Sequence, residues 1–340
     1  MSGRAAAAAP APKPARAPLW KRIWTPERRR WLGPALAVAF LALVGWLVAD
    51  HVKEIDWGEV RASIAAYPLT TLAAAAGLVV ASHLTYACYD LLGRRYVGHT
   101  LPKTTVLGVA FVSYAFNLNL GAMVGGVAFR VRLYSRLGLD AAQIGRIYAF
   151  SVVTNWSGWL LLAGAAFVVG GIQLPQSFPV SEAAMRAVGL VMIAVPLAYV
   201  VSCFASKKRE WRWRDHAFVL PSGRMALAQL GISSLNWSLI ATIVWLLLPK
   251  ELTYGTVLAT LLSAAVIGAA THVPGGLGVL EAVFIAALSG QVPAHTLIAA
   301  LLAYRALYYL APLLVAAAMH FTLEAVAKRR KARGARPRKR

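Results

Sequence analysis

The feature that most constrains the fold of this chain is a series of six long apolar runs separated by short polar loops. Each run has about 20 or more residues, the length at which an α-helix crosses the hydrocarbon core of a bilayer. Because 59% of the 340 residues are hydrophobic and only 14% are charged, we predict an all-α polytopic membrane protein. The runs lie at residues 31–49, 68–92, 141–169, 185–204, 224–248 and 294–326.

The net charge of +22 could suggest a nucleic-acid partner, but the basic residues are placed as membrane flanks. Of the 35 Lys and Arg residues, eight precede Trp31, six lie in 207–224 and nine lie in 328–340. Basic flanks mark the cytoplasmic side of a membrane and contact anionic lipids. We therefore predict a multi-pass protein of the bacterial inner membrane with both termini in the cytoplasm, membrane lipids as partners and no nucleic acid.

The remaining segments bound the domain organisation. Residues 1–30 are Ala/Pro-rich and basic, which predicts a disordered cytoplasmic leader, and residues 327–340 predict a basic cytoplasmic tail. The spacing of Ile55, Val60 and Ile64 predicts a short amphipathic helix at the membrane interface. Cys88 and Cys203 have no metal-type spacing, so we predict no metal site and no cofactor.

Two further apolar stretches, 101–138 and 253–290, are interrupted by residues that break helices. The second contains THVPGGLGVLE, in which Pro274 removes a backbone donor and three glycines permit a turn. Broken backbone is tolerated at membrane depth only where protein buries it or it lines a cavity. The arms after the turns, 127–137 and 279–289, span about 16 Å of a hydrocarbon core about 30 Å thick. We therefore predict two glycine-turned re-entrant or broken hairpins.

The order of spans and hairpins repeats. Residues 31–170 and 183–326 each comprise two spans, a hairpin and one span, at an offset of about 150 residues. Because each unit crosses the membrane an odd number of times, the second is predicted to be inverted relative to the first. Inverted repeats with matched broken helices are typical of secondary transporters, whose sites lie near the midplane.

The second hairpin carries the strongest candidate site. One interpretation of PGGLG is a tight turn that lets helices pack closely. The other is that the turn directs helix N-terminal amides into a cavity, where they bind an anion. In the second interpretation Glu281, just after the turn, is a gating or coupling carboxylate.

Two arginines and several polar side chains allow alternative interpretations. Arg130 either extends to the cytoplasmic interface or reaches a cavity, where its guanidinium suits a phosphate. Arg305 lies about 11 residues inside the last run, so it needs Glu281, a substrate phosphate or water as a partner. Asp90 is interpreted as an interfacial partner of Arg94. Helix–helix packing is the simpler interpretation for the other polar or aromatic side chains in the spans, which include His83, Asn155, Asn236, Tyr304, Tyr308 and Tyr309.

The motifs PGGLGVLEA, Gly125–Arg130 and the YR…Y…P pattern of the last run resemble those of the transmembrane region of lysylphosphatidylglycerol synthases. The resemblance covers about residues 30–325. In the full-length enzymes it implies a flippase region, beside a separate soluble domain that transfers the amino acid. This sequence has no room for that domain, so aminoacylation is not expected and the substrate does not carry over.

We therefore hypothesise a lipid flippase or transporter that moves a polar lipid headgroup, anionic or aminoacylated, through a midplane cavity. The alternative is a non-transporting accessory protein for envelope-lipid metabolism. No nucleophile or acid–base set supports an enzyme. The candidate substrate-binding residues are Asn117, Asn119, Gly125, Gly126, Arg130, Pro274, Gly275, Gly276, Gly278, Glu281, Tyr304 and Arg305.

Overall fold

The computed structural model describes residues 57–170, 181–207, 209–213, 216–271 and 273–320. Within these residues, seven helices are long and apolar enough to cross a membrane, which confirms the all-α polytopic class. They are α4 (Leu69–Val97), α5 (Lys103–Gly121), α7 (Ala141–Val169), α8 (Glu182–Ala205), α9 (Gly223–Leu247), α10 (Tyr254–Thr271) and the helix Ala294–His320. The predicted first span at 31–49, the leader and the tail lie outside the described residues.

The last of these helices is irregular. It starts as α12 (Ala294–Arg305), continues through the π-helical segment η3 (Ala306–Leu310) and remains helical to His320. A π-helical turn widens the helix and often lies at a functional site. It directly follows Arg305, one of the candidate site residues.

The two predicted hairpins are present and their second arms are short. In the second hairpin, α10 is followed by the 3₁₀ turn η2 (Pro274–Gly276) and by α11 (Val279–Leu288). With 10 residues, α11 is about 15 Å long and too short to span a bilayer. In the first hairpin, α5 is followed by the π-helix η1 (Ala122–Ala128) and by α6 (Phe129–Arg136).

The first hairpin turns earlier than predicted, at Gly121 with φ of +81°. Gly125 and Gly126 instead lie within η1, where they let it pack directly on α5. A Cβ built on Gly125 would lie 2.1 Å from the Phe116 carbonyl oxygen, so no larger residue fits. The glycine pair therefore permits close approach of two arms, which the sequence did not distinguish from a turn.

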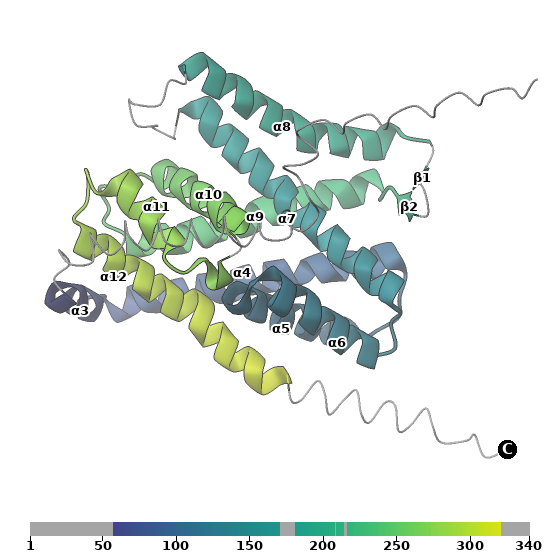
Figure 1. Ribbon diagram of the computed structural model, residues 1–340, viewed down its shortest axis with the longest axis horizontal. Helices are drawn as coiled ribbons and strands as arrows, with labels where there is room; N and C mark the ends of the chain where they lie inside the picture. The colour runs from purple at the N-terminus through teal and green to yellow at the C-terminus, as the bar shows by residue number, and fades with distance from the viewer. Residues whose placement is uncertain (1–56, 171–180, 208, 214–215, 272, 321–340) are drawn as a thin grey trace, which may run out of the picture.

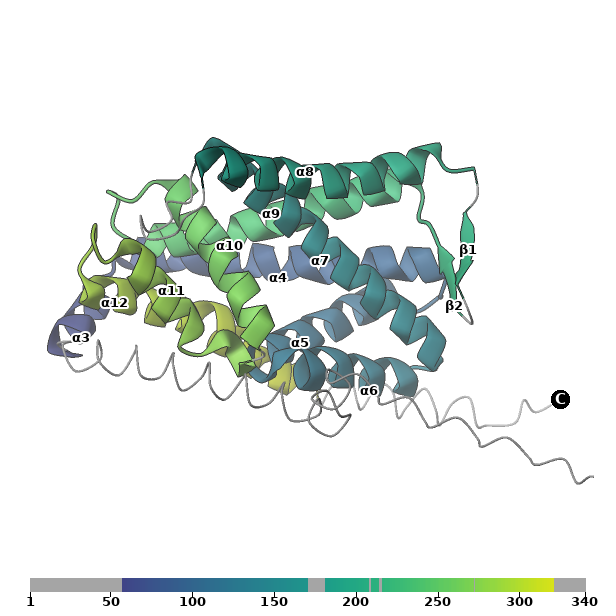
Figure 2. The ribbon, with the colours of Figure 1, turned by 45° about the horizontal axis from the view of Figure 1, so that its top comes forward.

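Helices α4 and α9 run antiparallel through the centre of the molecule (Figures 1 and 2). The Tyr67 hydroxyl, just before α4, donates to the Leu247 carbonyl at the end of α9, over 2.5 Å. Near the other end, the Tyr96 hydroxyl of α4 donates to the Val219 carbonyl that precedes α9, also over 2.5 Å. Because these helices occupy equivalent places in the two proposed repeats, their opposite directions agree with an inverted arrangement. The orientation of the termini in a membrane stays a prediction.

The two hairpins extend from opposite ends of the long axis, and their tips meet in the middle (Figures 1 and 2). A Cβ built on Gly275 in η2 would lie 3.3 Å from the Leu118 carbonyl oxygen and 3.5 Å from that of Asn119, near the end of α5. Gly275 also has φ of +66°, in the left-handed region that favours glycine. The tips of the two hairpins are thus in contact, and Gly121, Gly275 and Gly276 of the broken backbone line a cavity, one of the two situations in which such backbone is tolerated at membrane depth.

Two smaller elements lie at the ends of the helices. A helix is present where the short interfacial one was predicted, as α3 (Trp57–Ala65), where Glu59 pairs with His295 of α12 over 3.0 Å. Its position at a membrane interface stays a prediction, and Ile55 lies outside the described residues. The basic loop after α8 contains an antiparallel hairpin of β1 (Glu210–Trp213) and β2 (His216–Val219), which the sequence did not predict.

The outer surface of the helices is apolar. On α8, which lies at one edge of the molecule, Leu190 is 59% exposed and Val191 is 64% exposed (Figure 1). Continuous exposed apolar side chains on a long helix suit contact with lipid tails. The buried core lies instead between α4, α9 and α12 and the second hairpin.

Candidate functional site

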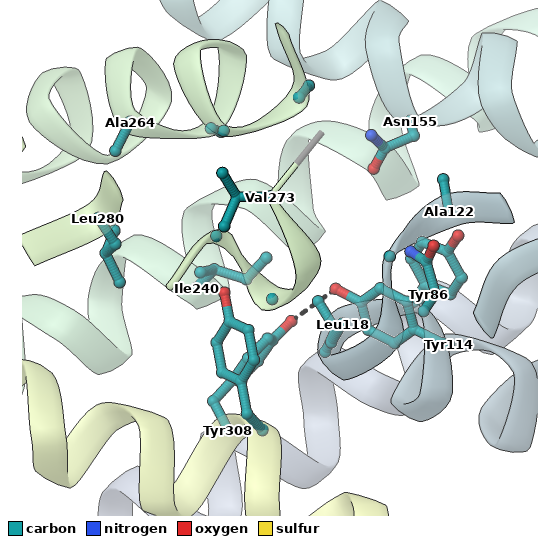
Figure 3. A pocket seen from close by; sticks show the side chains of 18 of the residues that line it. Tyr86, Tyr114, Leu118, Ala122, Asn155, Ile240, Ala264, Val273, Leu280 and Tyr308 are labelled. Atoms are coloured by element: carbon teal, nitrogen blue, oxygen red, sulfur yellow. Dashed lines mark hydrogen bonds between the residues drawn. The ribbon is translucent and has the colours of Figure 1, made fainter. Parts of the chain in front are cut away.

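A cavity of about 600 Å³ lies where the two hairpins meet α4, α7 and α9 (Figure 3). Its size is in the range of small-molecule sites, about 300–1,000 Å³. One part of its wall is apolar, with Leu261, Ala264 and Leu280 of the second hairpin. Further apolar residues, among them Leu118, Ile240 and Val273, line other parts of it. The polar or aromatic side chains in the wall are Tyr86, Tyr114, Asn117, Arg130, Tyr148, Ser151, Asn155, Trp156, Trp237, Tyr304, Tyr308 and Tyr309.

The exposed residues that line the cavity are apolar and lie near the middle of the helices. Met123, 74% exposed, and Ala122 lie just after the tip of the first hairpin, and Ala269 lies near the tip of the second. Val152, 36% exposed, lies close to the middle of α7. Together with Leu120, 43% exposed near the end of α5, these residues form an apolar rim, defined as Leu120, Ala122, Met123, Val152 and Ala269. The cavity therefore combines a cluster of polar side chains in a largely apolar wall with a rim that suits hydrocarbon.

Arg130 of α6 lies in the cavity wall and pairs with Asp90 of α4. Its Nε and Nη2 donate to the two carboxylate oxygens of Asp90 over 3.2 and 3.1 Å. The hydroxyls of Tyr134 and Ser151 each donate to the same carboxylate over 2.9 Å. Arg130 is 1% exposed and Asp90 is fully buried. A buried carboxylate with four donors is well compensated for its loss of hydration.

This arrangement decides two alternatives from the sequence. Arg130 does not extend to the interface, because it is buried against Asp90 and the ring of Tyr86, 5.9 Å from the guanidinium carbon. The predicted pair of Asp90 with Arg94 is wrong. Arg94 instead donates its Nε to the Leu101 carbonyl over 2.7 Å, in the loop after α4. Closeness in the sequence did not identify the partner of Asp90, because the Asp90 side chain faces the first hairpin rather than the next turn of α4.

Arg305 of α12 holds the second hairpin together. Its guanidinium donates to both carboxylate oxygens of Glu281, with 3.0 Å from Nη2 to Oε2. It also donates to the carbonyls of Gly275 and Gly276 over 2.9 and 2.8 Å. The ion pair with Glu281 was one of the alternatives from the sequence. The two carbonyl contacts are new, and they satisfy backbone groups that the broken helix leaves without helical partners.

Behind the cavity wall, hydroxyl groups form a chain from α5 to α9. The hydroxyls of Tyr114 and Tyr308 are 2.9 Å apart (Figure 3), and Tyr308 is 2.9 Å from the Ser82 hydroxyl. Ser82 donates to the Asn236 side-chain oxygen over 2.8 Å. The ring of His83 lies beside both tyrosines. Tyr308 therefore takes part in a hydrogen-bond chain in addition to the packing role predicted from the sequence.

The structure brings most of the candidate residues to one region. Asn117, Arg130, Gly275, Gly276 and Tyr304 line the cavity, whereas Glu281 and Arg305 are not among the residues that line it. Asn119 donates to the Tyr309 carbonyl over 3.2 Å. Gly126 packs on Asn117, Pro274 starts η2, and Gly278 precedes α11 with φ of +76°. Whether any of them contacts a substrate stays a prediction.

Sequence reasoning missed the part of the wall that α4 contributes. His83, Tyr86 and Asp90 recur at intervals of three and four residues, which places them on one face of a helix. All three are buried in an otherwise apolar span. That spacing was the signal that could have grouped them as one polar stripe facing the first hairpin.

The fold and cavity define a multi-pass membrane protein in which two re-entrant hairpins and the central helices surround a cavity with polar groups in its wall. The family model described as "Lysylphosphatidylglycerol synthase TM region" matches residues 31–316. The chain belongs to this family, which confirms the resemblance seen in the sequence.

Three relatives place the chain within that family. It is 45% identical to "Inner membrane protein YbhN" of Escherichia coli, over 86% of this chain and 92% of that protein. It is 31% identical to an uncharacterised protein of Synechocystis, over 82% and 86% of the two chains. It is 23% identical to "Phosphatidylglycerol lysyltransferase" of Staphylococcus haemolyticus, over 82% of this chain but only 32% of the enzyme. The chain is thus related to a lipid-modifying enzyme and to a stand-alone membrane protein.

Proposed function

We propose that this protein moves a lipid across the inner membrane, with the polar headgroup in the cavity and the acyl chains outside its rim. The observation that carries the proposal is a cavity with a cluster of polar side chains in its wall and an apolar rim at the level of the hairpin tips. An amphiphile has the same division, since its headgroup needs polar partners and its chains need hydrocarbon. The relation to a protein named for phosphatidylglycerol chemistry supports a lipid as substrate.

The charges near the cavity favour a headgroup with an anionic part. Arg130 is the only charged side chain among the described residues that line the cavity. A guanidinium binds phosphate oxygens strongly when water is excluded. Asp90 already neutralises Arg130, so we propose that an anionic headgroup shares this arginine with Asp90 and uses Asn117 and Asn155 as further partners.

We also propose that both termini are cytoplasmic and that the lipid crosses without covalent chemistry. The basic flanks of the apolar runs support the orientation. The Arg305–Glu281 pair then has a positioning role, because it fixes the shape of the second hairpin without lining the cavity.

The test is leaflet exchange of fluorescent lipids by purified protein in liposomes, with one variant that fills the cavity. Gly268 of α10 lines the cavity, and a Cβ built there has nothing within 4 Å. Gly268→Trp should therefore block the cavity without a backbone clash. Gly231 of α9 has equal space, is exposed and does not line the cavity, so Gly231→Trp is the matched control.

The expected result is exchange by the wild type and by Gly231→Trp, and its loss in Gly268→Trp. If wild-type protein moves neither anionic nor zwitterionic lipids, the accessory role in envelope-lipid metabolism becomes the better account. If Gly268→Trp exchanges lipid as fast as the wild type, the path does not run through this cavity.

A further inference from the structure

His83 is a buried titratable side chain that the proposed lipid path does not use. It lies near the middle of α4 and is 2% exposed. Its Nδ1 is 3.0 Å from the Val79 carbonyl, one turn earlier in the same helix. A carbonyl only accepts, so Nδ1 carries the proton and Nε2 keeps a free lone pair. Among the described residues, Nε2 has no hydrogen-bond partner.

The ring of His83 lies directly behind the cavity wall. Its centroid is 5.2 Å from the ring of Tyr114 on α5 and 4.8 Å from the ring of Tyr308 in η3, and both tyrosines line the cavity. The third ring beside it belongs to Phe111, at 5.7 Å. A proton that reaches the cavity is thus one layer of side chains away from a vacant basic nitrogen.

Two other buried polar atoms, on α5 and α9, also have no hydrogen-bond partner among the described residues. They are the hydroxyl of Ser113, between Phe111 and Tyr114 on α5, and the side-chain nitrogen of Asn236, at the end of the hydroxyl chain. Buried polar atoms without protein partners are the usual sites of internal water.

We propose that His83 is a proton-binding site, and that its protonation is coupled to the presence of an anionic headgroup in the cavity. The coupling part rests on the proposed function, whereas the proton site does not. A buried imidazolium among aromatic rings is unfavourable by itself, because burial penalises the charged form. An anion on the other side of Tyr114 and Tyr308 offsets that penalty, so proton and anion favour each other's binding.

The groups that face His83 set the direction of this effect. Tyr114 from α5 and Tyr308 from η3 are the titratable groups in ring contact with it, and Tyr86 stacks on Tyr114. The nearest ion pair on the same face of α4 is Asp90 with Arg130, whose charges compensate each other. Lowering the pH therefore adds one net positive charge beside the cavity, which favours anionic headgroups.

The first test follows hydrogen–deuterium exchange at the imidazole C2 of each histidine by mass spectrometry, with the full chain in lipid nanodiscs. This exchange depends on the protonation state and on access of water. We expect the exchange rate of the His83 C2 hydrogen to change with pH around one midpoint. Gly268→Trp fills the cavity and hinders access of water, so it should slow this exchange by about tenfold, which corresponds to about 1.4 kcal/mol. His99, in the loop after α4, should be unaffected and serves as the internal reference.

The second test compares nanodiscs of phosphatidylcholine with nanodiscs that contain phosphatidylglycerol. We expect the anionic lipid to raise the proton affinity of His83 by about fivefold or more beyond the common shift seen at His99 and His295, the lower end of typical couplings between sites. The proposal is overturned if the His83 C2 hydrogen is retained at every pH, or if its midpoint shifts only as much as the two reference histidines.

A third readout links the proton to transport. Where the wild type exchanges anionic lipid, the rate should rise as the pH is lowered from about 8 to about 4, a window that extends to low pH because burial penalises the charged imidazole. His83→Gln should remove this difference, while His99→Gln keeps it. Exchange that is present but independent of pH contradicts only the coupling, and absence of all exchange contradicts the proposed function instead.

Discussion

Replacing Asp90 by Asn tests whether the buried pair with Arg130 stabilises the first hairpin. The substitution keeps the shape of the side chain but removes its charge. In the wild type, Arg130, Tyr134 and Ser151 donate four hydrogen bonds to the two oxygens of Asp90. In Asp90→Asn one of these oxygens becomes an NH₂ group, which is a donor and cannot accept the hydrogen bonds directed at it. The guanidinium then remains 1% exposed with its carboxylate partner gone.

The size of the effect follows from burial. Removing one partner of a buried ion pair costs about 3–5 kcal/mol, because the other charge stays buried without compensation. An exposed pair of i,i+4 type contributes about 0.3–0.5 kcal/mol. This chain offers such a pair in Arg186 and Glu182 on α8, 2.8 Å apart and 57% and 74% exposed. Glu182→Gln is therefore a matched control with the same change in charge.

The assay is reversible unfolding in mixed micelles with increasing SDS, which gives a free energy of unfolding for each variant. We expect Asp90→Asn to lower it by several kcal/mol and Glu182→Gln to leave it nearly unchanged. The double variant Asp90→Leu with Arg130→Met should recover most of the loss, since apolar replacements of a buried pair are often neutral. Equal, small losses in the two single variants would show that the Asp90 cluster does not hold the hairpin.

Three further predictions concern the hairpins. Arg305→Lys keeps the charge but loses the planar guanidinium that binds Glu281 and two backbone carbonyls, so we expect a lower free energy of unfolding in the same SDS assay. An unchanged midpoint of SDS unfolding argues against this positioning role of Arg305. Gly125→Ala should prevent correct folding, because the new Cβ would lie 2.1 Å from a carbonyl oxygen, whereas Gly231→Ala should be neutral or stabilising; gel filtration separates the two outcomes. Met123→Cys should react slowly with a water-soluble maleimide in membranes, because the reactive thiolate does not form in hydrocarbon, and rapid labelling contradicts an apolar rim. The side chain is 74% exposed, so burial within the protein does not account for such protection.

The sequence was sufficient for the spans that lie in the described residues and for the short second arm of the second hairpin, whereas the second arm of the first hairpin starts at Ala122 rather than at 127. Helix α7 has the predicted bounds, and α11 differs from prediction by one residue. This follows because bilayer thickness and backbone satisfaction restrict the chain to few solutions. The β-hairpin after α8 was not predicted, since no such restriction acts on a polar loop outside the membrane.

The site was predicted only in part, because partners came from distant elements. Arg305 and Glu281 are 24 residues apart, and their pair could be proposed from the cost of an unpaired intramembrane charge. The Asp90 and Arg130 pair joins residues 40 apart on α4 and α6, and its recognition needed the packing of the first hairpin. The cavity itself depends on where the two hairpin tips meet, which no local pattern specifies.

The central claim is that a lipid headgroup occupies the cavity, and site-specific photocrosslinking tests it most directly. A photoreactive amino acid in place of Asn155, which lines the cavity, is compared with one in place of Leu190, which is 59% exposed on α8. Mass spectrometry then identifies the crosslinked lipids. We predict that position 155 captures lipid headgroups enriched in anionic species, while position 190 captures the acyl chains of bulk lipid in the proportions of the membrane. No lipid at position 155, or the same composition at both positions, would contradict a headgroup site in the cavity.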